Sequence, residues 1–192
     1  MIEEAKKILK AEAEAILNLK IDQNFELAIK EILNCKGKLI TTGLGKAGYI
    51  ARKAASTFST TGSPSIYLHP ADSSHGDVGV ISSQDVLLAI SNSGGTREVI
   101  ETVLFCKSLG VKSVIGITGN TESKLAELSD TLISIGKIKE PCPLGMTPSA
   151  SASAMLALCD CLALVAMKER GFSKEDFAKR HHGGYLGEKS RN

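Results

Sequence analysis

One stretch constrains the fold of this chain more than any other: an apolar run over residues 86–90 that ends abruptly in hydroxyl and glycine residues. The run has no polar residue on either face, which suits a strand covered by helices on both sides. Directly after it come Ser91, Ser93 and Thr96 around two glycines, and then a helical pattern resumes. We therefore predict a central strand of a parallel sheet, followed by a loop and the start of a helix.

The loop after this strand has the chemistry of an anion site. In parallel α/β sheets, ligands collect beyond the carboxyl ends of the strands. The hydroxyl groups, the backbone N–H groups at Gly94 and Gly95, and the positive end of the following helix all favour a phosphate here. A polar connection that merely caps the helix is the alternative interpretation. The loop holds no lysine of the GxxxxGK[ST] kind, which disfavours a nucleotide P-loop.

Composition narrows the class of protein. A chain of 192 residues with 43% hydrophobic content can bury one sizeable core, so we expect a single domain over residues 1–192. With 23 basic and 21 acidic residues and no run of like charges, neither nucleic acid nor a membrane is an expected partner. The acidic residues at the amino terminus do not resemble a secretory signal, which predicts a cytoplasmic chain. Five cysteines without metal-ligand spacing are interpreted as reduced core thiols, and no metal is expected.

Periodicity divides the domain into three parts. Residues 1–36 are expected to form two leading helices, over 2–20 and 23–34, with Asp22 capping the second. An α/β core with a long helix follows over residues 37–170, and a C-terminal helix, which Ser173 can cap, with a tail over 171–192. Strands are expected at 38–42, 65–68, 86–90, 113–118 and 131–135, with helices after the first strand up to about residue 60 and over 98–109 and 122–129. Right-handed crossovers between these strands give a parallel sheet between two helix layers.

Two further strand ends carry polar residues. After the first strand, residues 43–48 read GLGKAG, but this GxGxxG pattern lacks the acidic residue that a dinucleotide site needs at the end of the next strand. Its Lys46 is either a ligand for an anionic substrate or a solvated lysine at a helix start. After the second strand, residues 70–77 are expected to form an irregular polar turn. There His75, near Asp77, is either a group for proton transfer or an ordinary surface histidine.

The last third of the core is expected to be an irregular loop followed by a long apolar helix. Three prolines in residues 140–148 exclude regular structure there. The helix expected over 149–170 is apolar nearly all round, but its uninterrupted apolar part is too short to span a bilayer. We expect its outer face to contact another chain. The candidates for that face are Met155, Leu158, Leu162 and Val165.

Five blocks of residues resemble one known family in their order. They are TTGLGKAG, HPADSSHGDVG, AISNSGGTREV, EPCPLGMTPSASASA and RHHGGYLG. Together they are similar to sugar isomerase (SIS) domains, and within these to arabinose-5-phosphate isomerases. The resemblance implies a three-layer α/β/α fold whose five-stranded parallel sheet has the order 2-1-3-4-5, usually assembled as a homotetramer. Many relatives continue into a pair of CBS domains, and this sequence stops before them, at Asn192.

The resemblance also implies a reaction and a set of residues. The reaction is the interconversion of D-ribulose 5-phosphate and D-arabinose 5-phosphate through an enediol, without a cofactor. By resemblance Ser91, Ser93 and Thr96 bind the phosphate, and Gly45, Thr147 and Ser149 are further substrate contacts. Four positions match catalytic ones: Glu98, Lys46, His75 and His181. Glu98 is the expected base, although it would also complement the dipole of a helix start.

For the other three catalytic positions the expected roles differ. Lys46 would stabilise the enediolate, and His75 or His181 would transfer oxygen-bound protons or open the sugar ring. The tail would carry His181 into the site of a neighbouring subunit.

Two other functions stay open. A second phosphosugar could be the substrate, because the phosphate and enediol chemistry would be shared. A non-catalytic SIS module that senses a sugar phosphate is disfavoured, since only about 37 residues precede the first strand and they hold no basic recognition helix. The resemblance places the product in the synthesis of Kdo for lipopolysaccharide or capsule. It also makes nucleotide-activated Kdo a possible inhibitor.

Overall fold

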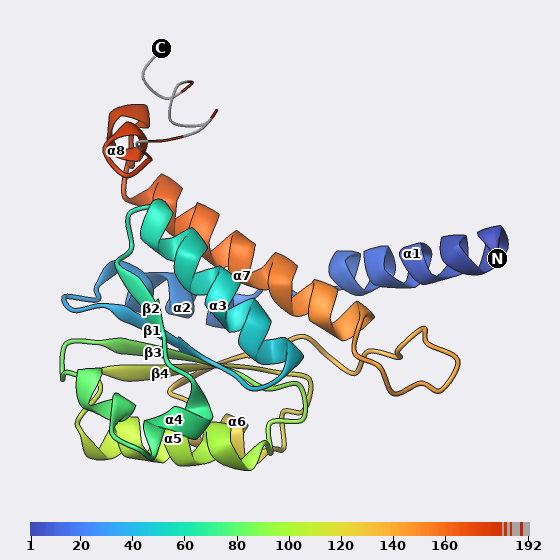
Figure 1. The fold of residues 1–192 in the computed structure, drawn as a ribbon, viewed down its shortest axis with the longest axis horizontal. Helices are drawn as coiled ribbons and strands as arrows, with labels where there is room; N and C mark the ends of the chain where they lie inside the picture. Colours follow the sequence, from blue (N-terminus) through green and yellow to red (C-terminus); the bar gives the residue numbers. More distant parts are fainter. Residues whose placement is uncertain (182, 184, 186–188, 190–192) are drawn as a thin grey trace.

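The computed structural model describes residues 1–181, 183, 185 and 189 (Figure 1). Its five strands form one all-parallel sheet in the order β2-β1-β3-β4-β5, which confirms the predicted topology. The strands are β1 (Leu39–Thr42), β2 (Ser65–Tyr67), β3 (Val86–Ile90), β4 (Ser113–Thr118) and β5 (Thr131–Ser134).

Helices cover both faces of this sheet, as Figure 1 shows, so the predicted three-layer arrangement is confirmed. One layer contains α2 (Gln23–Leu33), α3 (Lys46–Thr60) and α7 (Ala150–Glu169), with α1 (Ile2–Leu17) packed on α7 and projecting beyond the sheet. The other layer contains α4 (Pro70–Ser73), α5 (Arg97–Ser108) and α6 (Lys124–Leu128), and α8 (Lys174–Ala178) follows α7.

Strand β3 lies at the centre of the core. All five of its side chains have an exposed fraction of 0%. Leu88 and Ile90 join the apolar cluster under α2, α3 and α7, whereas Leu87 and Ala89 join the cluster under α5 and α6. A strand that is buried on both faces needs no polar alternation, which is why the run over 86–90 could be recognised in the sequence.

Two predicted helix starts are confirmed. The Asp22 carboxylate accepts a hydrogen bond from the Asn24 backbone N–H at 2.9 Å, and Ser173 forms a reciprocal capping box with Asp176. The expected irregular turn over 70–77 is wrong in part, because Pro70 opens the single-turn helix α4 and a 3₁₀ turn covers Asp77–Val80. Proline fits the first turn of a helix, and a helix of four residues is too short for periodicity to reveal.

The expected outer face of α7 is also wrong. Met155, Leu158 and Leu162 are at most 2% exposed within the chain, and Val165 is half-buried. Helix α7 packs against α1, α2 and α3, so it buries more than one face, and Leu164 points outward instead. Within the described residues, α7 is the one helix whose length and apolar composition would suit a membrane span, and 50% of that stretch is buried inside the fold.

The interpretation of the cysteines as core thiols holds for two of them. Cys106 and Cys159 are buried, and burial raises the pKa of each thiol to about 12. Cys161 is exposed, and Cys35 and Cys142 are half-buried. All five thiols are free, and the described part of the chain contains no cluster of three or more groups that could hold a metal ion.

Candidate functional site

The loop over residues 91–96 brings three hydroxyl groups to the start of α5. Ser91 Oγ and Thr96 Oγ1 lie 2.9 Å apart. The backbone N–H of Gly94 donates to Ser91 Oγ at 3.2 Å, and that of Gly95 donates to Ser93 Oγ at 3.3 Å. Ser91 is buried and Ser93 is exposed, so the hydroxyl groups run from the base of the loop to its surface. The loop therefore gathers three hydroxyl groups at the start of α5, where the helix dipole favours an anion.

Neighbouring segments fix the loop from behind. Gly94 has φ +65°, and a Cβ there would lie 1.9 Å from Ser123 Oγ, so only glycine fits. The Leu125 backbone N–H donates to the Gly94 carbonyl at 2.9 Å, and Thr118 Oγ1 donates to the Asn92 carbonyl at 3.1 Å. The segment between β4 and α6 therefore holds the loop in one conformation.

Glu98 lies in the first turn of α5, next to this loop. Arg97 donates to Glu101 at 2.7 Å and makes no hydrogen bond to Glu98 within the described part of the chain. Within the described part of the chain, the Glu98 carboxylate makes no hydrogen bond and no side chain caps α5. The half-buried Glu98 carboxylate and the first N–H groups of α5 are thus available to a ligand.

Lys46 lies at the same edge of the sheet. β1 pairs with β3, so their carboxyl ends are neighbours, separated by about 4.8 Å in the plane of the sheet. Gly45, with φ +60°, ends the loop after β1, and the exposed Lys46 is the first residue of α3. The Tyr67 hydroxyl donates to the Gly43 carbonyl at 2.9 Å and ties this loop to β2. The structure therefore brings Gly45 and Lys46 to the strand end beside loop 91–96.

His75 follows α4 and is exposed. Its backbone N–H donates to the Asp72 carbonyl at 2.9 Å. The buried Ser73 Oγ lies 2.7 Å from Thr102 Oγ1 of α5, one turn after Glu98. The segment that carries His75 is therefore docked on the helix that carries Glu98.

Thr147 and Ser149 lie in the loop that leads into α7, where sequence reasoning missed a third residue, Glu140. The Glu140 carboxylate accepts hydrogen bonds from the backbone N–H groups of Ser149 (2.8 Å), Ala150 (2.9 Å) and Ser151 (3.3 Å). Glu140 precedes Ser149 by nine residues, so the three-residue spacing of a capping box could not reveal it. The Glu140 carboxylate therefore occupies the start of α7.

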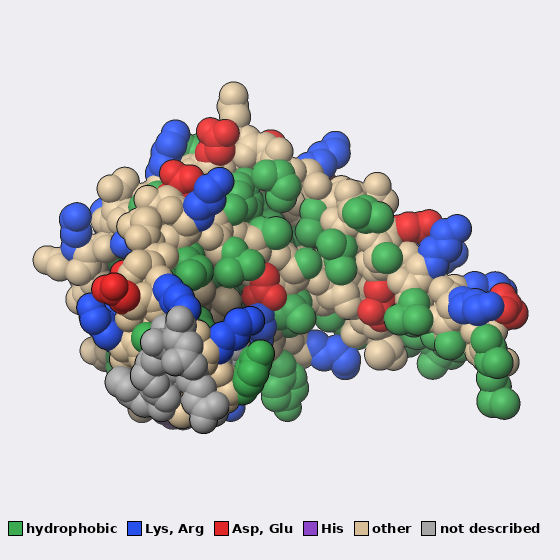
Figure 2. All heavy atoms as spheres, turned by 90° about the horizontal axis from the view of Figure 1, so that it is seen from above, with side chains coloured by type: hydrophobic (Ala, Val, Ile, Leu, Met, Phe, Trp, Pro, Cys, Tyr) green, Lys and Arg blue, Asp and Glu red, His purple; other side chains and the backbone are tan. Residues whose placement is uncertain are grey.

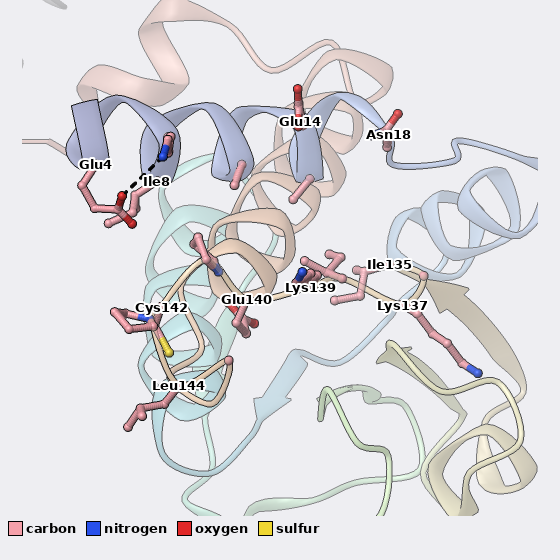
Figure 3. A pocket seen from close by; sticks show the side chains of 18 residues that line it. Glu4, Ile8, Glu14, Asn18, Ile135, Lys137, Lys139, Glu140, Cys142 and Leu144 are labelled. Carbon is pink, nitrogen blue, oxygen red and sulfur yellow. Dashed lines mark ion pairs between the residues drawn. The ribbon is translucent and has the colours of Figure 1, made fainter. Parts of the chain in front are cut away.

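A second acceptor in this loop is a sulfur atom. The backbone N–H groups of Met146 and Thr147 each donate to Cys142 Sγ at 3.2 Å. The N–H of Thr147, and then that of Met146, lowers the pKa of the Cys142 thiol to about 7. Figure 3 shows Glu140, Cys142 and Leu144 on one side of a groove of about 950 Å³, with Glu4 and Ile8 of α1 on the other.

His181 lies at the other end of the molecule. Its ring stacks on Phe177 with centroids 4.1 Å apart, and Phe172 packs on Gly62, just after the last residue of α3. Lys46 begins α3, whose 15 residues span about 22 Å. Within one chain, His181 is thus not brought to the site. His182 and most of the tail lie outside the described residues.

The fold and this edge define a class: a parallel three-layer domain with a hydroxyl-lined loop after its central strand. A family model described as SIS domain matches residues 32–165. The chain belongs to the SIS domain family.

Within that family, the chain is 45% identical over 186 residues to arabinose 5-phosphate isomerase KdsD of Shigella flexneri and to its counterpart in Escherichia coli K12. Each alignment covers 96% of this chain and 56% of the relative, so the chain spans about half the length of these curated relatives.

Two solved structures extend the comparison. A candidate phosphosugar isomerase involved in capsule formation from Bacteroides fragilis matches with TM-score 0.93 and 45% identity, over 96% of this chain and 99% of that one. A protein of Escherichia coli CFT073, solved in complex with A5P, matches with TM-score 0.88 and 35% identity, over 94% and 96% of the two chains.

Proposed function

We propose that this chain interconverts D-ribulose 5-phosphate and D-arabinose 5-phosphate through an enediol. The observation that carries the proposal is the open start of α5, where loop 91–96 offers hydroxyl and N–H groups and Glu98 has an unengaged carboxylate among the described residues. The names of the KdsD relatives and the A5P-bound relative support this substrate.

The proposed reaction needs few groups, and the geometry supports a distinct role for each of them. Loop 91–96 anchors the dianionic phosphate and fixes the pose. Glu98 removes a proton from one of carbons C1 and C2 and returns it to the other, while the hydroxyl proton moves between the two oxygens. Lys46, on the neighbouring strand end, stabilises the negative oxygen of the enediolate. His75 or His181 handles the oxygen-bound protons or the opening of the sugar ring.

The remaining predicted contacts have narrower roles. Gly45 offers backbone, since a side chain is absent and the space around its Cβ position is open. The Ser149 N–H is engaged by Glu140 and its hydroxyl oxygen is buried, so the hydroxyl of the exposed Thr147 is the more accessible group for a contact with sugar. The scheme uses no metal and no cofactor.

The position of His181 supports a site shared between subunits of a homotetramer. His181 lies near the end of α3 opposite Lys46, so in this proposal it enters the site of a neighbouring subunit. The molecule exposes 10392 Å², against about 8,800 Å² for a compact monomer of 20.3 kDa. Apolar side chains also gather over α7 and α1 (Figure 2). Leu9 of α1 and Leu164 of α7 are exposed apolar residues of these two helices.

Mixed oligomers test the shared site. Co-refolding Glu98→Gln with His181→Ala should restore part of the activity, because some pockets draw both intact residues from different chains. Mixed oligomers that stay as inactive as either parent would exclude a shared site.

We infer further that the enzyme acts in the cytoplasm and supplies Kdo synthesis for lipopolysaccharide or capsule. The capsule role named for the Bacteroides fragilis relative supports the second route. Nucleotide-activated Kdo would then be a feedback inhibitor, which a titration of the purified enzyme with that compound tests.

The decisive experiment is an isomerase assay over pentose, hexose and heptose phosphates. We expect turnover of D-arabinose 5-phosphate and D-ribulose 5-phosphate, with solvent deuterium entering the substrate at the exchanging carbon. The Glu98→Gln variant serves as the matched inactive enzyme. Preference for a hexulose phosphate would replace the pentose assignment, and binding without turnover of any substrate would favour a sensing module.

A further inference from the structure

A polar hollow adjoins the site on the side away from loop 91–96. It has a volume of about 280 Å³ and lies between the first turns of α3 and the end of β2. Its lining residues are Gly45, Gly48, Tyr49, Arg52, Tyr67 and His69. Among these six described residues there are two groups that can be cationic and no carboxylate.

Arg52 is held in place without being neutralised. Its guanidinium lies over the Tyr67 ring, 5.1 Å from the centroid, and the Tyr67 hydroxyl is fixed on the Gly43 carbonyl. Within the described part of the chain, Arg52 forms no ion pair and no hydrogen bond, whereas the next residue, Lys53, pairs with Asp160. The N–H groups at the edge of the guanidinium are therefore available for a planar or tetrahedral anion.

His69 adds an imidazole to this hollow. Its Nδ1 is buried and lies 3.5 Å from the Asp72 carboxylate, whereas 39% of the side chain is exposed. The ring meets Tyr67 edge-on at 6.1 Å. The exposed part of the ring, and not Nδ1, is therefore the part of His69 that a ligand in the hollow can contact.

The sheet fixes the distance from this hollow to the phosphate loop. The carboxyl ends of β2, β1 and β3 follow one another, so His69 and Ser91 stand two strand spacings apart, about 10 Å in the plane of the sheet. Lys46 lies between them, at the end of β1. A ligand that extends from loop 91–96 past Lys46 ends at Arg52.

We propose that this hollow is a second anion subsite, which holds the distal anionic group of a doubly charged sugar ligand whose first phosphate occupies loop 91–96. The ligand class is a pentose bisphosphate or a phosphorylated sugar acid, and such a compound would inhibit the isomerase. The proposal rests on the proposed function only for the placement of the first phosphate.

The test compares ribulose 1,5-bisphosphate with ribulose 5-phosphate in the full chain. We expect the bisphosphate to be a competitive inhibitor that binds more tightly than the monophosphate. Arg52→Ala should raise its inhibition constant about tenfold to a hundredfold, the loss expected when hydrogen bonds to a charged group disappear, and at least tenfold more than it raises KM. Lys53→Ala, the matched removal of a neighbouring cation, should leave both constants unchanged.

Calorimetry separates failure of this proposal from failure of the isomerase assignment. Tighter, Arg52-dependent binding of the bisphosphate supports the subsite even where ribulose 5-phosphate is not turned over. Equal affinity for the two compounds, or the same loss for Arg52→Ala and Lys53→Ala, overturns the subsite even in an active isomerase. A circular dichroism spectrum identical to wild type shows that the Arg52→Ala variant is folded.

Discussion

Helices α5 and α7 both begin after an irregular loop, yet the backbone N–H groups of their first turns have different partners. At α7, the chain supplies its own anion, since the Glu140 carboxylate accepts three backbone N–H groups. At α5, the described residues supply no side-chain cap, and the nearest acceptors are the neutral hydroxyl groups of loop 91–96. Since every helix start leaves backbone donors unsatisfied, the filled start serves stability and the open one can serve binding.

The loops differ in the acceptors that they use. Loop 91–96 is held by Ser123 and Leu125 against Gly94, and its own Ser91 and Ser93 hydroxyl groups accept the Gly94 and Gly95 N–H groups. The loop before α7 is held by Glu140 and by Cys142 Sγ. Only the second loop places a carboxylate on the N–H groups of the helix that follows it, so among the described residues the first N–H groups of α5 remain available to a ligand.

The largest effect that tests this contrast is expected at Glu98. Glu98→Gln keeps the shape of the side chain but removes its basicity, so turnover should fall about 10²- to 10⁴-fold with little change in KM. Steady-state kinetics with D-arabinose 5-phosphate measure both constants. If Glu98 merely complements the helix dipole, activity will survive with a slightly lower melting temperature, because such effects amount to about 0.3 to 1 kcal/mol.

The next largest effect is expected on stability, at the filled helix start. Glu140→Ala removes the acceptor of three partly buried N–H groups, and each unsatisfied donor costs about 1 to 3 kcal/mol. We expect the free energy of unfolding to fall by about 3 kcal/mol, as measured by urea denaturation. Glu122→Ala, at an exposed loop position, should change it by less than about 0.5 kcal/mol. Equal midpoints for the two variants would show that Glu140 does not stabilise α7.

The role of Glu140 marks the limit of what the sequence could predict. The strands and the caps at Asp22 and Ser173 were predicted from local patterns, whereas the order of the strands was implied by the family resemblance. The Glu140 bonds depend on how an irregular, proline-rich loop folds back, which no periodicity encodes. Likewise, the all-apolar pattern of α7 could not tell how many neighbours bury it, so Leu158 was wrongly expected on an outer face.

The candidate site also has a part that the sequence could predict and a part that it could not. Residues directly after strands, such as Ser91 and Lys46, were predictable because strand ends of a parallel sheet share one edge. The polar hollow beside α3 was not predicted. Its residues Arg52 and His69 come from a helix and a strand end, and only the sheet order brings these together.

At the open start of α5, single hydroxyl groups should matter less than Glu98. Replacing Ser91, Ser93 or Thr96 by Ala removes one hydrogen bond to a charged phosphate, which costs about 1.5 to 3 kcal/mol. KM should therefore rise roughly tenfold to a hundredfold in each variant, while kcat changes less. Ser74→Ala, at an exposed position in the same layer, is the control. Unchanged KM in all three variants would mean that the phosphate binds elsewhere.

The smallest effect is expected at Cys142, in the loop that fills its own helix start. Two N–H donors lower its pKa to about 7 from an ordinary value of 9.0, so they favour the thiolate in the folded state. The resulting stabilisation is complete above pH 9 and is lost as the pH falls through 7. Alkylation by iodoacetamide, followed by mass spectrometry, should accelerate through pH 7 at Cys142, while the buried Cys106 and Cys159 stay unmodified. A rate that rises only near pH 9 would show that these N–H groups do not hold the sulfur.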